Sequence, residues 1–389
     1  MKGMTMNSSN AFAKEVKALG QTVLVLQGGG ALGAYQVGVY EALHQSGVAP
    51  DWVIGTSIGA INASLIAGSK PTERVEKMCD FWSRVQNDRF VPGGLPNWLE
   101  SAARNWQAVA GGVPNFFSPN PMAFLSPHQP LGPESAGYYS VNRLRQTLGE
   151  LVDIDELNSG TTRITVGASN VRTAEMRYFD SREMPIGVDH ILASGALPPA
   201  FPPVRIDGEL YWDGGILSNT PVEVVFDDNP RRNSLVFAVH IWNPHGPAPE
   251  TIWDVMNRQK DVQYSSRAVS HIQRQRQIHR LRHIIAELGK MIPDDKRRDN
   301  IVGDLTAYGC LTRMHVVRLL APALDHEDHS KDIDFSAVGI RRRREAGYRD
   351  TMQTLEKAPW RGPVDELEGF VLHESSGGEM VDTAAASKP

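Results

Sequence analysis

Two kinds of segment alternate along the first 240 residues. Short apolar runs, typical of strands buried in a sheet, are followed by stretches with apolar residues at helical spacing. The pattern predicts strands at 22–26, 52–54, 163–168, 176–179, 209–212 and 235–239. It predicts helices at 33–45, 58–68, 72–87 and 188–196. The alternation of strand and helix indicates an α/β protein with a parallel sheet covered by helices.

Residues 91–140 interrupt this pattern with an irregular segment rich in Pro and Gly. A long irregular segment within a compact domain is usually a functional loop or lid. Its aromatic residues are Trp98, Trp106, Phe116, Phe117, Phe124, Tyr138 and Tyr139. Two roles remain open for them: an apolar lid or membrane-touching surface, or plain packing of the loop onto the core.

The pattern changes again after about residue 245. A long helix at 251–290, a strand at 314–320 that could rejoin the sheet and a charged helix at 334–358 predict a mostly helical C-terminal extension. The expected organisation is an N-terminal tail (1–20), a catalytic domain (21–245), the extension (246–370) and a disordered tail (371–389).

Composition narrows the class of protein. The 41% content of hydrophobic residues suits a globular chain of 389 residues, and a net charge of −5 gives no reason to expect a nucleic-acid partner. Cys79 and Cys310 are too few for a disulfide framework, which favours a reducing, cytoplasmic location. No secretory signal or membrane span is evident, so any membrane contact is expected to be peripheral, at the inner membrane face.

The segment between the strand at 52–54 and the next helix has the pattern G-x-S-x-G, in Gly55-Thr56-Ser57-Ile58-Gly59. This pattern is typical of the turn that lifts a serine nucleophile above a sheet. Side chains at Gly55 and Gly59 would collide with the adjoining strand and helix. The motif alone fits a nucleophile or an ordinary turn equally well.

A glycine run, Gly28-Gly29-Gly30, ends the first strand. Free backbone N–H groups beside a helix N-terminus form an anion-binding nest, which suits the oxyanion of an acyl-transfer intermediate. Residues 28–33 also satisfy G-x-G-x-x-G, so a dinucleotide-binding oxidoreductase is a remote alternative. That alternative expects an acidic residue after the second strand, where this chain has Ser57.

Asp213, in Asp213-Gly214-Gly215, is a candidate general base, although Asp-Gly is also a common turn dipeptide. Aspartate is a weak base with an ordinary pKa of about 3.9, which a site poor in water would raise. A Ser–Asp–His triad is the alternative, with His240 as the best candidate. A buried histidine without a catalytic role is the more common situation at such a position.

Four motifs in this order resemble the patatin-like phospholipases of the bacterial type. They are residues 28–33, residues 55–59, the run Ala193-Ser194-Gly195-Ala196-Leu197-Pro198-Pro199-Ala200-Phe201-Pro202-Pro203-Val204, and Asp213-Gly214-Gly215. The resemblance implies a three-layer α/β/α fold and a Ser–Asp dyad that acts on lipid esters. It makes Ser57 the nucleophile, Asp213 the base, and Gly28, Gly29 and Gly30 the oxyanion hole. One departure is Leu32, where the family usually has Arg or Lys.

These features together predict a serine acyl hydrolase that cleaves fatty acyl esters of phospholipids or related lipids through an acyl-Ser57 intermediate. A lipid acyltransferase on the same dyad and a non-catalytic lipid-binding protein are the alternatives. The hydrolase interpretation implies no metal or organic cofactor, and His279 and His283, at i, i+4 spacing, lack the nearby Glu base or further ligands of a metal site. The basic stretch 258–282 suits either anionic lipid headgroups or solvent, and a homo-oligomer stays open.

Overall fold

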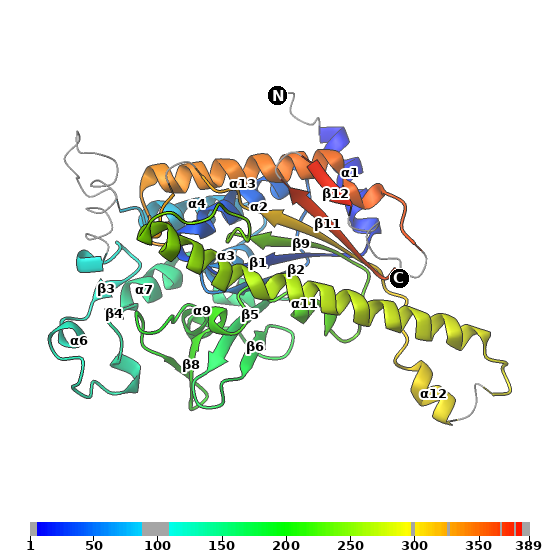
Figure 1. Cartoon of the computed structure of the whole chain (residues 1–389), viewed down its shortest axis with the longest axis horizontal. Coiled ribbons are helices and arrows are strands. Elements are labelled where there is room, and N and C mark those ends of the chain that lie inside the picture. Colours follow the sequence, from blue (N-terminus) through cyan, green and yellow to red (C-terminus); the bar gives the residue numbers. More distant parts are fainter. Residues whose placement is uncertain are drawn as a thin grey trace.

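The computed structural model describes residues 6–87, 109–296, 300–324, 327–365, 368–376 and 379–382. Within these ranges the chain forms one large sheet with helices on both of its faces (Figure 1). The expected α/β fold with a mainly parallel sheet is confirmed. Trp98 and Trp106, two of the aromatic residues of the irregular segment, lie outside the described residues.

The sheet is parallel at its centre and antiparallel toward its ends. Its strands, in spatial order, are β12 (Glu379–Asp382), β11 (Phe370–Ser376), β10 (Met314–Leu320), β9 (Ser234–His240), β1 (Gln21–Leu26), β2 (Trp52–Thr56), β5 (Arg163–Asn170), β8 (Glu209–Asp213) and β7 (Val204–Ile206). β6 (Met176–Asp180) also pairs with β5. The pairs from β11 to β5 are parallel, whereas β12, β6, β8 and β7 join in antiparallel orientation.

Helices cover the two faces unequally. The longer helices are α1 (Met6–Ala18), α2 (Ala34–Gln45), α3 (Ile58–Ala67), α4 (Arg74–Arg84), α7 (Asn142–Leu151), α9 (Val188–Ser194), α11 (Ile252–Met291), α12 (Asn300–Thr306) and α13 (Ala337–Lys357). The larger apolar cluster gathers residues of α1, α2, α3, α4, α9 and α13 on one face, and the smaller one lies against α10 (Glu223–Phe226) and α11. No helix within the described ranges combines the length and hydropathy needed to span a bilayer.

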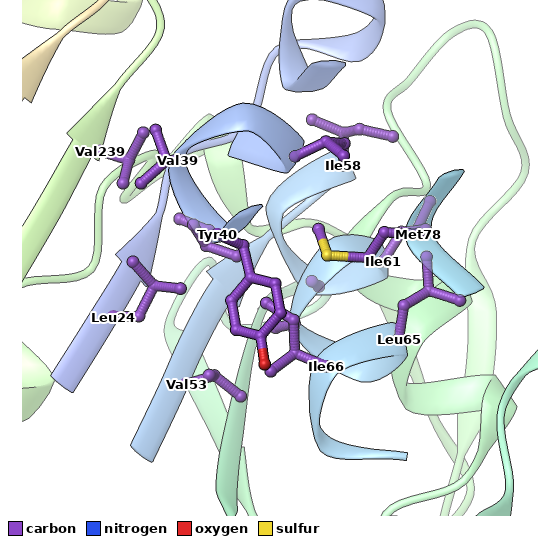
Figure 2. Packing of buried hydrophobic residues seen from close by; sticks show 14 of the residues in the cluster. Leu24, Val39, Tyr40, Val53, Ile58, Ile61, Leu65, Ile66, Met78 and Val239 are labelled. Atoms are coloured by element: carbon purple, nitrogen blue, oxygen red, sulfur yellow. The ribbon is translucent and has the colours of Figure 1, made fainter. Parts of the chain in front are cut away.

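The larger cluster packs the two central strands against the helices that follow them. Leu24 of β1 and Val53 of β2 lie beside Tyr40 of α2 and Ile61 of α3, and all four side chains are almost completely buried (Figure 2). Each side chain of this size contributes roughly 1.5–3 kcal/mol through burial. The start of α3 is therefore held firmly on the sheet, directly after Ser57.

The C-terminal region continues the same sheet. The strand expected at 314–320 is present as β10, which pairs in parallel with β9 over its whole length. The prediction of a disordered tail from residue 371 is wrong for its first part, because β11 pairs with β10 from Met314↔Phe370 onward. Only three apolar residues in a row, Phe370 to Leu372, mark this strand, and its partner strand lies more than fifty residues away.

The irregular segment contributes to the core as well as to the surface. Phe116 and Phe117 are buried and make edge-to-face contacts with each other. Phe124, on the short helix α6 (Pro121–Leu125), is 49% exposed and packs on Tyr138. Packing onto the core is thus found for Phe116 and Phe117, whereas Phe124 lies partly exposed at the surface.

Candidate active site

The turn after β2 holds Ser57 in a strained backbone conformation. Its φ of 57° and ψ of −126° are unusual for a residue with a side chain, and such strain concentrates at functional sites. A Cβ atom at Gly55 would lie 2.3 Å from the Gly59 carbonyl oxygen, and one at Gly59 would lie 2.1 Å from the Leu26 carbonyl oxygen. Both glycines are therefore required by the close approach of strand and helix.

Strand register brings Asp213 to the level of Ser57. Thr56 pairs with Gly167 of β5, and the next residue of β5, Ala168, pairs with Asp213 of the antiparallel strand β8. Ser57 and Asp213 therefore lie on either side of β5 at the same height. Their side chains line one cavity and form a hydrogen bond.

Burial makes Asp213 a stronger base than an ordinary aspartate. Its side chain is 2% exposed, and burial raises its pKa to about 7, while hydrogen bonds from Ser57 and from the Gly215 N–H act in the opposite direction. The Gly215 N–H donates to Oδ1 at 2.7 Å, which fixes the carboxylate. A carboxylate with this pKa is suited to accept a proton near neutral pH.

Ser194, at the end of α9, supports the strained turn. Its hydroxyl accepts a hydrogen bond of 2.9 Å from the Ser57 N–H and donates one of 2.6 Å to the Gly167 carbonyl. The side chain is completely buried, so neither bond competes with solvent. Ser194 thus connects the nucleophile backbone to β5, the strand between Ser57 and Asp213.

The glycine loop after β1 lies beside this turn, because β1 and β2 are parallel neighbours with Leu26 paired to Gly55. The N–H of Gly28 donates to the Asn219 carbonyl at 3.2 Å. Among the described residues, the N–H groups of Gly29 and Gly30 have no such acceptor. Both glycines line the cavity that contains Ser57. Of the three glycines expected in the oxyanion hole, Gly28 thus has its N–H engaged in a hydrogen bond, and only Gly29 and Gly30 have N–H groups without an acceptor among the described residues.

Buried polar side chains hold the loop in place. The Gly28 carbonyl accepts hydrogen bonds from Trp242 Nε1 at 2.8 Å and from Asn219 Nδ2 at 3.1 Å. Gln27 Oε1 accepts the N–H groups of Ile241 and Trp242, and its amide nitrogen donates to Thr220 at 2.7 Å. Since each of these groups is buried, loss of one partner would leave another unsatisfied, at about 1–3 kcal/mol.

The cavity next to the dyad has a volume of about 300 Å³. Apart from the polar groups around Ser57, its walls are mostly apolar. They include Ile61, Phe116, Phe117, Val141, Leu144, Leu192, Leu197 and Phe201. A cavity of this size and character suits an extended hydrocarbon chain better than a polar ligand.

His240 lies away from this cavity. It is completely buried, on the face of β9 that also carries Val236 and Ala238 and packs toward α10 and α11. Burial, together with the positive charge of Arg318, holds its pKa well below the ordinary value. No histidine of the described ranges lines the cavity of Ser57 and Asp213. His240 is therefore not part of the site that contains Ser57 and Asp213.

Several of these residues carried no assigned role in the sequence. Gln27 and Asn219 stand beside the glycine run and the Asp-Gly turn, so their position near motifs was an available signal. Tyr264 and Asp332 also line the cavity, yet nothing in their local sequence points to it.

Cys79 and Cys310 are both free. Within the described ranges, no group of three or more His, Cys, Asp or Glu side chains could hold a metal ion.

Several known proteins are similar to this chain. Mouse patatin-like phospholipase domain-containing protein 6 is 28% identical over 212 residues, covering 53% of this chain and 12% of that protein. Neuropathy target esterase sws of Drosophila melanogaster is 26% identical over 208 residues, 52% of this chain and 12% of that protein. The chain thus matches a small part of these much longer relatives. The crystal structure of VipD from Legionella pneumophila aligns over 86% of this chain and 66% of that one, at 16% identity and a TM-score of 0.35.

Two family models match the chain itself. The model described as patatin-like phospholipase matches residues 24–226, more than half of the sequence, and includes every element that carries Ser57, Asp213 and the glycine loop. A second model, described as patatin phospholipase, matches residues 262–367 of the C-terminal region. Together with the fold, these matches show that the chain belongs to the patatin-like phospholipase family.

Proposed function

We propose that this protein is a serine acyl hydrolase that cleaves fatty acyl esters of phospholipids or related lipids with a Ser57–Asp213 dyad. The observation that carries the proposal is the pairing of a strained serine with a buried aspartate of pKa about 7 at the wall of an apolar cavity. Perturbed titratable groups in clefts are typical of catalytic sites. The family names support lipid hydrolysis in general terms.

In the first step of the proposed reaction, Ser57 Oγ attacks the ester carbonyl while the Asp213 carboxylate takes its proton. The negative charge on the carbonyl oxygen is received by the N–H groups of Gly29 and Gly30. Donors placed in advance for this charge typically supply about 2.7–4 kcal/mol each to the barrier reduction. The tetrahedral intermediate then collapses to acyl-Ser57, and Asp213 returns the proton to the departing alcohol.

In the second step, water attacks the acyl-enzyme and transfers a proton to Asp213, and the fatty acid leaves as Ser57 regains its proton. An alcohol or thiol in place of water would make the protein an acyltransferase. The apolar walls support an acyl chain as the group held next to Ser57. The headgroup and positional preference are left open by the proposal.

We also propose peripheral contact with a lipid surface near the cavity. On one side, α6 exposes Met122, Phe124 and Leu125, and Phe124 packs on the cavity residue Tyr139. On the other side, the first turn of α11 exposes Ile252 and its neighbour Trp253. Figure 1 shows α6 and the start of α11 at the end of the molecule where β1 and β9 end. Exposed apolar groups of this kind mark interaction surfaces.

The helix α12 carries another exposed apolar stripe, formed by Ile301 and Leu305 at i, i+4 spacing, and Tyr308 is exposed just after the helix. Figure 1 shows α12 projecting beyond the sheet. This stripe supports the proposal of a homo-oligomer, because large exposed apolar side chains on one helix face are typical of contact surfaces. Light scattering over a range of concentrations would test it.

Lipid profiling tests the function directly. Purified protein is incubated with vesicles of mixed phospholipids, and released fatty acids and lysolipids are measured by mass spectrometry, with Ser57→Ala as the matched control. The proposal expects release by the wild type and none by the variant. Products that carry the acyl group on a second alcohol would indicate acyl transfer. Equal release by both proteins, or by neither, would contradict the proposed function.

A further inference from the structure

We infer that residues 329–335, called the strap below, complete the active site from the C-terminal region, and that Lys260 of α11 positions them. The strap fixes the glycine loop and limits the length of the acyl chain that the cavity accepts. The inference rests on the proposed function, because the effects of the strap are expressed in ester hydrolysis. The strap lies outside the range 24–226 of the first family model and within the range 262–367 of the second, so it comes from a different part of the chain than Ser57 and Asp213.

The strap contacts the glycine loop through the backbone. The carbonyl of Asp332 accepts a hydrogen bond of 2.8 Å from the Ala31 N–H. A Cβ atom at Gly30 would lie 2.2 Å from the same carbonyl oxygen, and the φ of Gly30 is +55°. The bond therefore fixes the Gly30–Ala31 peptide, which directly follows the two N–H groups that the proposed reaction assigns to the oxyanion. A displaced strap would leave this peptide free to rotate.

Lys260 binds the strap with its ammonium group. Nζ donates to both carboxylate oxygens of Asp332, at 2.7 and 2.9 Å, and to the His329 carbonyl at 2.8 Å. Because an ammonium group has three donors, its whole capacity is directed to the strap. The side chains of Lys260 and Asp332 are 31% and 24% exposed, so the pair contributes little to global stability and acts mainly on geometry.

One face of α11 supports this contact. Trp253, seven residues before Lys260, stacks on the His329 ring with centroids 4.1 Å apart. Tyr264, four residues after Lys260, lines the cavity together with Asp332. Residues at this spacing share one helix face. The first half of α11 thus presents three consecutive contacts to the strap and the cavity.

The far end of the strap forms an apolar wall of the cavity. Ile333 and Phe335 line it, and Phe335 is 3% exposed. The Phe335 ring stacks on Trp82 with centroids 6.1 Å apart and lies 5.5 Å from Phe116. The Phe335 carbonyl also accepts the Asn87 N–H at 2.9 Å. Both ends of the strap are therefore anchored, and Phe335 closes the space that a longer chain would need.

Kinetic assays with a soluble ester distinguish a positioning role of Lys260 from a purely structural one. The Lys260→Met and Lys260→Arg variants of the full chain are assayed with p-nitrophenyl butyrate. The matched control is Arg276→Met, which removes a comparable 2.8 Å ion pair between α11 and Glu368, away from the glycine loop. We expect Lys260→Met to lower kcat about tenfold or more with KM nearly unchanged, because misplaced catalytic groups lose rate rather than binding. Lys260→Arg should restore most of kcat, and Arg276→Met should keep it.

Chain-length preference tests the wall. Phe335→Ala should shift kcat/KM toward p-nitrophenyl esters of longer acids by about tenfold, and Ile333→Ala should give a smaller shift in the same direction if the first variant does not fold. A folded Lys260→Met with wild-type kcat, together with unchanged chain-length preference, would overturn the inference. Wild-type protein without Ser57-dependent hydrolysis would instead refute the proposed function, and the inference would fall with it.

Discussion

The replacement Asp213→Asn should abolish activity and at the same time stabilise the protein at high pH. The carboxylate of Asp213 is buried, and its pKa in the folded state is about 7. The unfolded chain has the ordinary value of about 3.9. The folded state thus binds this proton more tightly, so the contribution of the carboxyl to stability is complete below pH 4 and is lost as the pH rises to 7.

The size of this loss follows from the shift. A rise of about three pKa units corresponds to about 4 kcal/mol at pH 8, of which about 1 kcal/mol is already lost at pH 4.5. An asparagine is neutral throughout and can still accept the Gly215 N–H. The difference in the free energy of unfolding, variant minus wild type, should therefore grow by about 3 kcal/mol between pH 4.5 and pH 8.

Urea unfolding followed by circular dichroism at both pH values measures this difference. Ser57→Ala is the matched control, because it is expected to be inactive yet keeps the Asp213 carboxyl and removes only a hydrogen bond that lowers its pKa. The free energy of unfolding of Ser57→Ala should not exceed that of the wild type at pH 8. In the wild type, kcat/KM should rise with pH to a plateau with an apparent pKa near 7, because the charged carboxylate is the base. Asp213→Asn should lose about 10²–10⁴-fold in activity.

A difference in the free energy of unfolding that stays constant with pH, in a folded Asp213→Asn protein, would contradict this prediction. It would mean that the buried carboxyl does not change its protonation between these pH values. An inactive variant with this constant difference would still leave Asp213 important, although not as a base tuned by burial.

Three further predictions concern residues around the dyad. Gly30→Ala should remove nearly all esterase activity from a folded protein, since its Cβ would meet the Asp332 carbonyl at 2.2 Å in a left-handed backbone conformation; wild-type kcat would argue against the assigned loop geometry. Ser194→Ala should lower kcat about tenfold with little change in KM, because the Ser57 N–H loses its acceptor. An unaltered kcat would show that the strained turn does not depend on Ser194. His240→Ala should keep most activity while lowering the melting temperature, and a folded but inactive variant would favour a triad.

The sequence predicted those parts of the site that depend on short segments. The turn at Ser57, the glycine run and the adjacency of their two strands follow from local motifs in an α/β pattern, and the structure has them together. The level of Asp213 relative to Ser57 required the antiparallel pairing of β8 with β5, which no local pattern encodes. The strand at 370–376 was missed because its few apolar residues give a weak signal until β10 is beside it.

The contacts that the C-terminal region makes with the active site were the part of the site that the sequence predicted least. Lys260 and Asp332 are separated by 72 positions, and a lysine on a basic helix is ordinarily a solvated residue. Leu32, which stands where the family usually has Arg or Lys, also gave no indication in the sequence that its side chain is buried. Contacts of this kind depend on long-range packing, which sequence periodicity does not report.

Covalent labelling identifies the nucleophile of this protein directly. Wild-type protein is treated with a fluorophosphonate, digested, and analysed by mass spectrometry to locate the adduct. We expect one adduct on Ser57, much slower labelling of Asp213→Asn, and wild-type labelling of His240→Ala. An adduct on another serine, or a folded wild-type protein that is not labelled at all, would contradict this expectation.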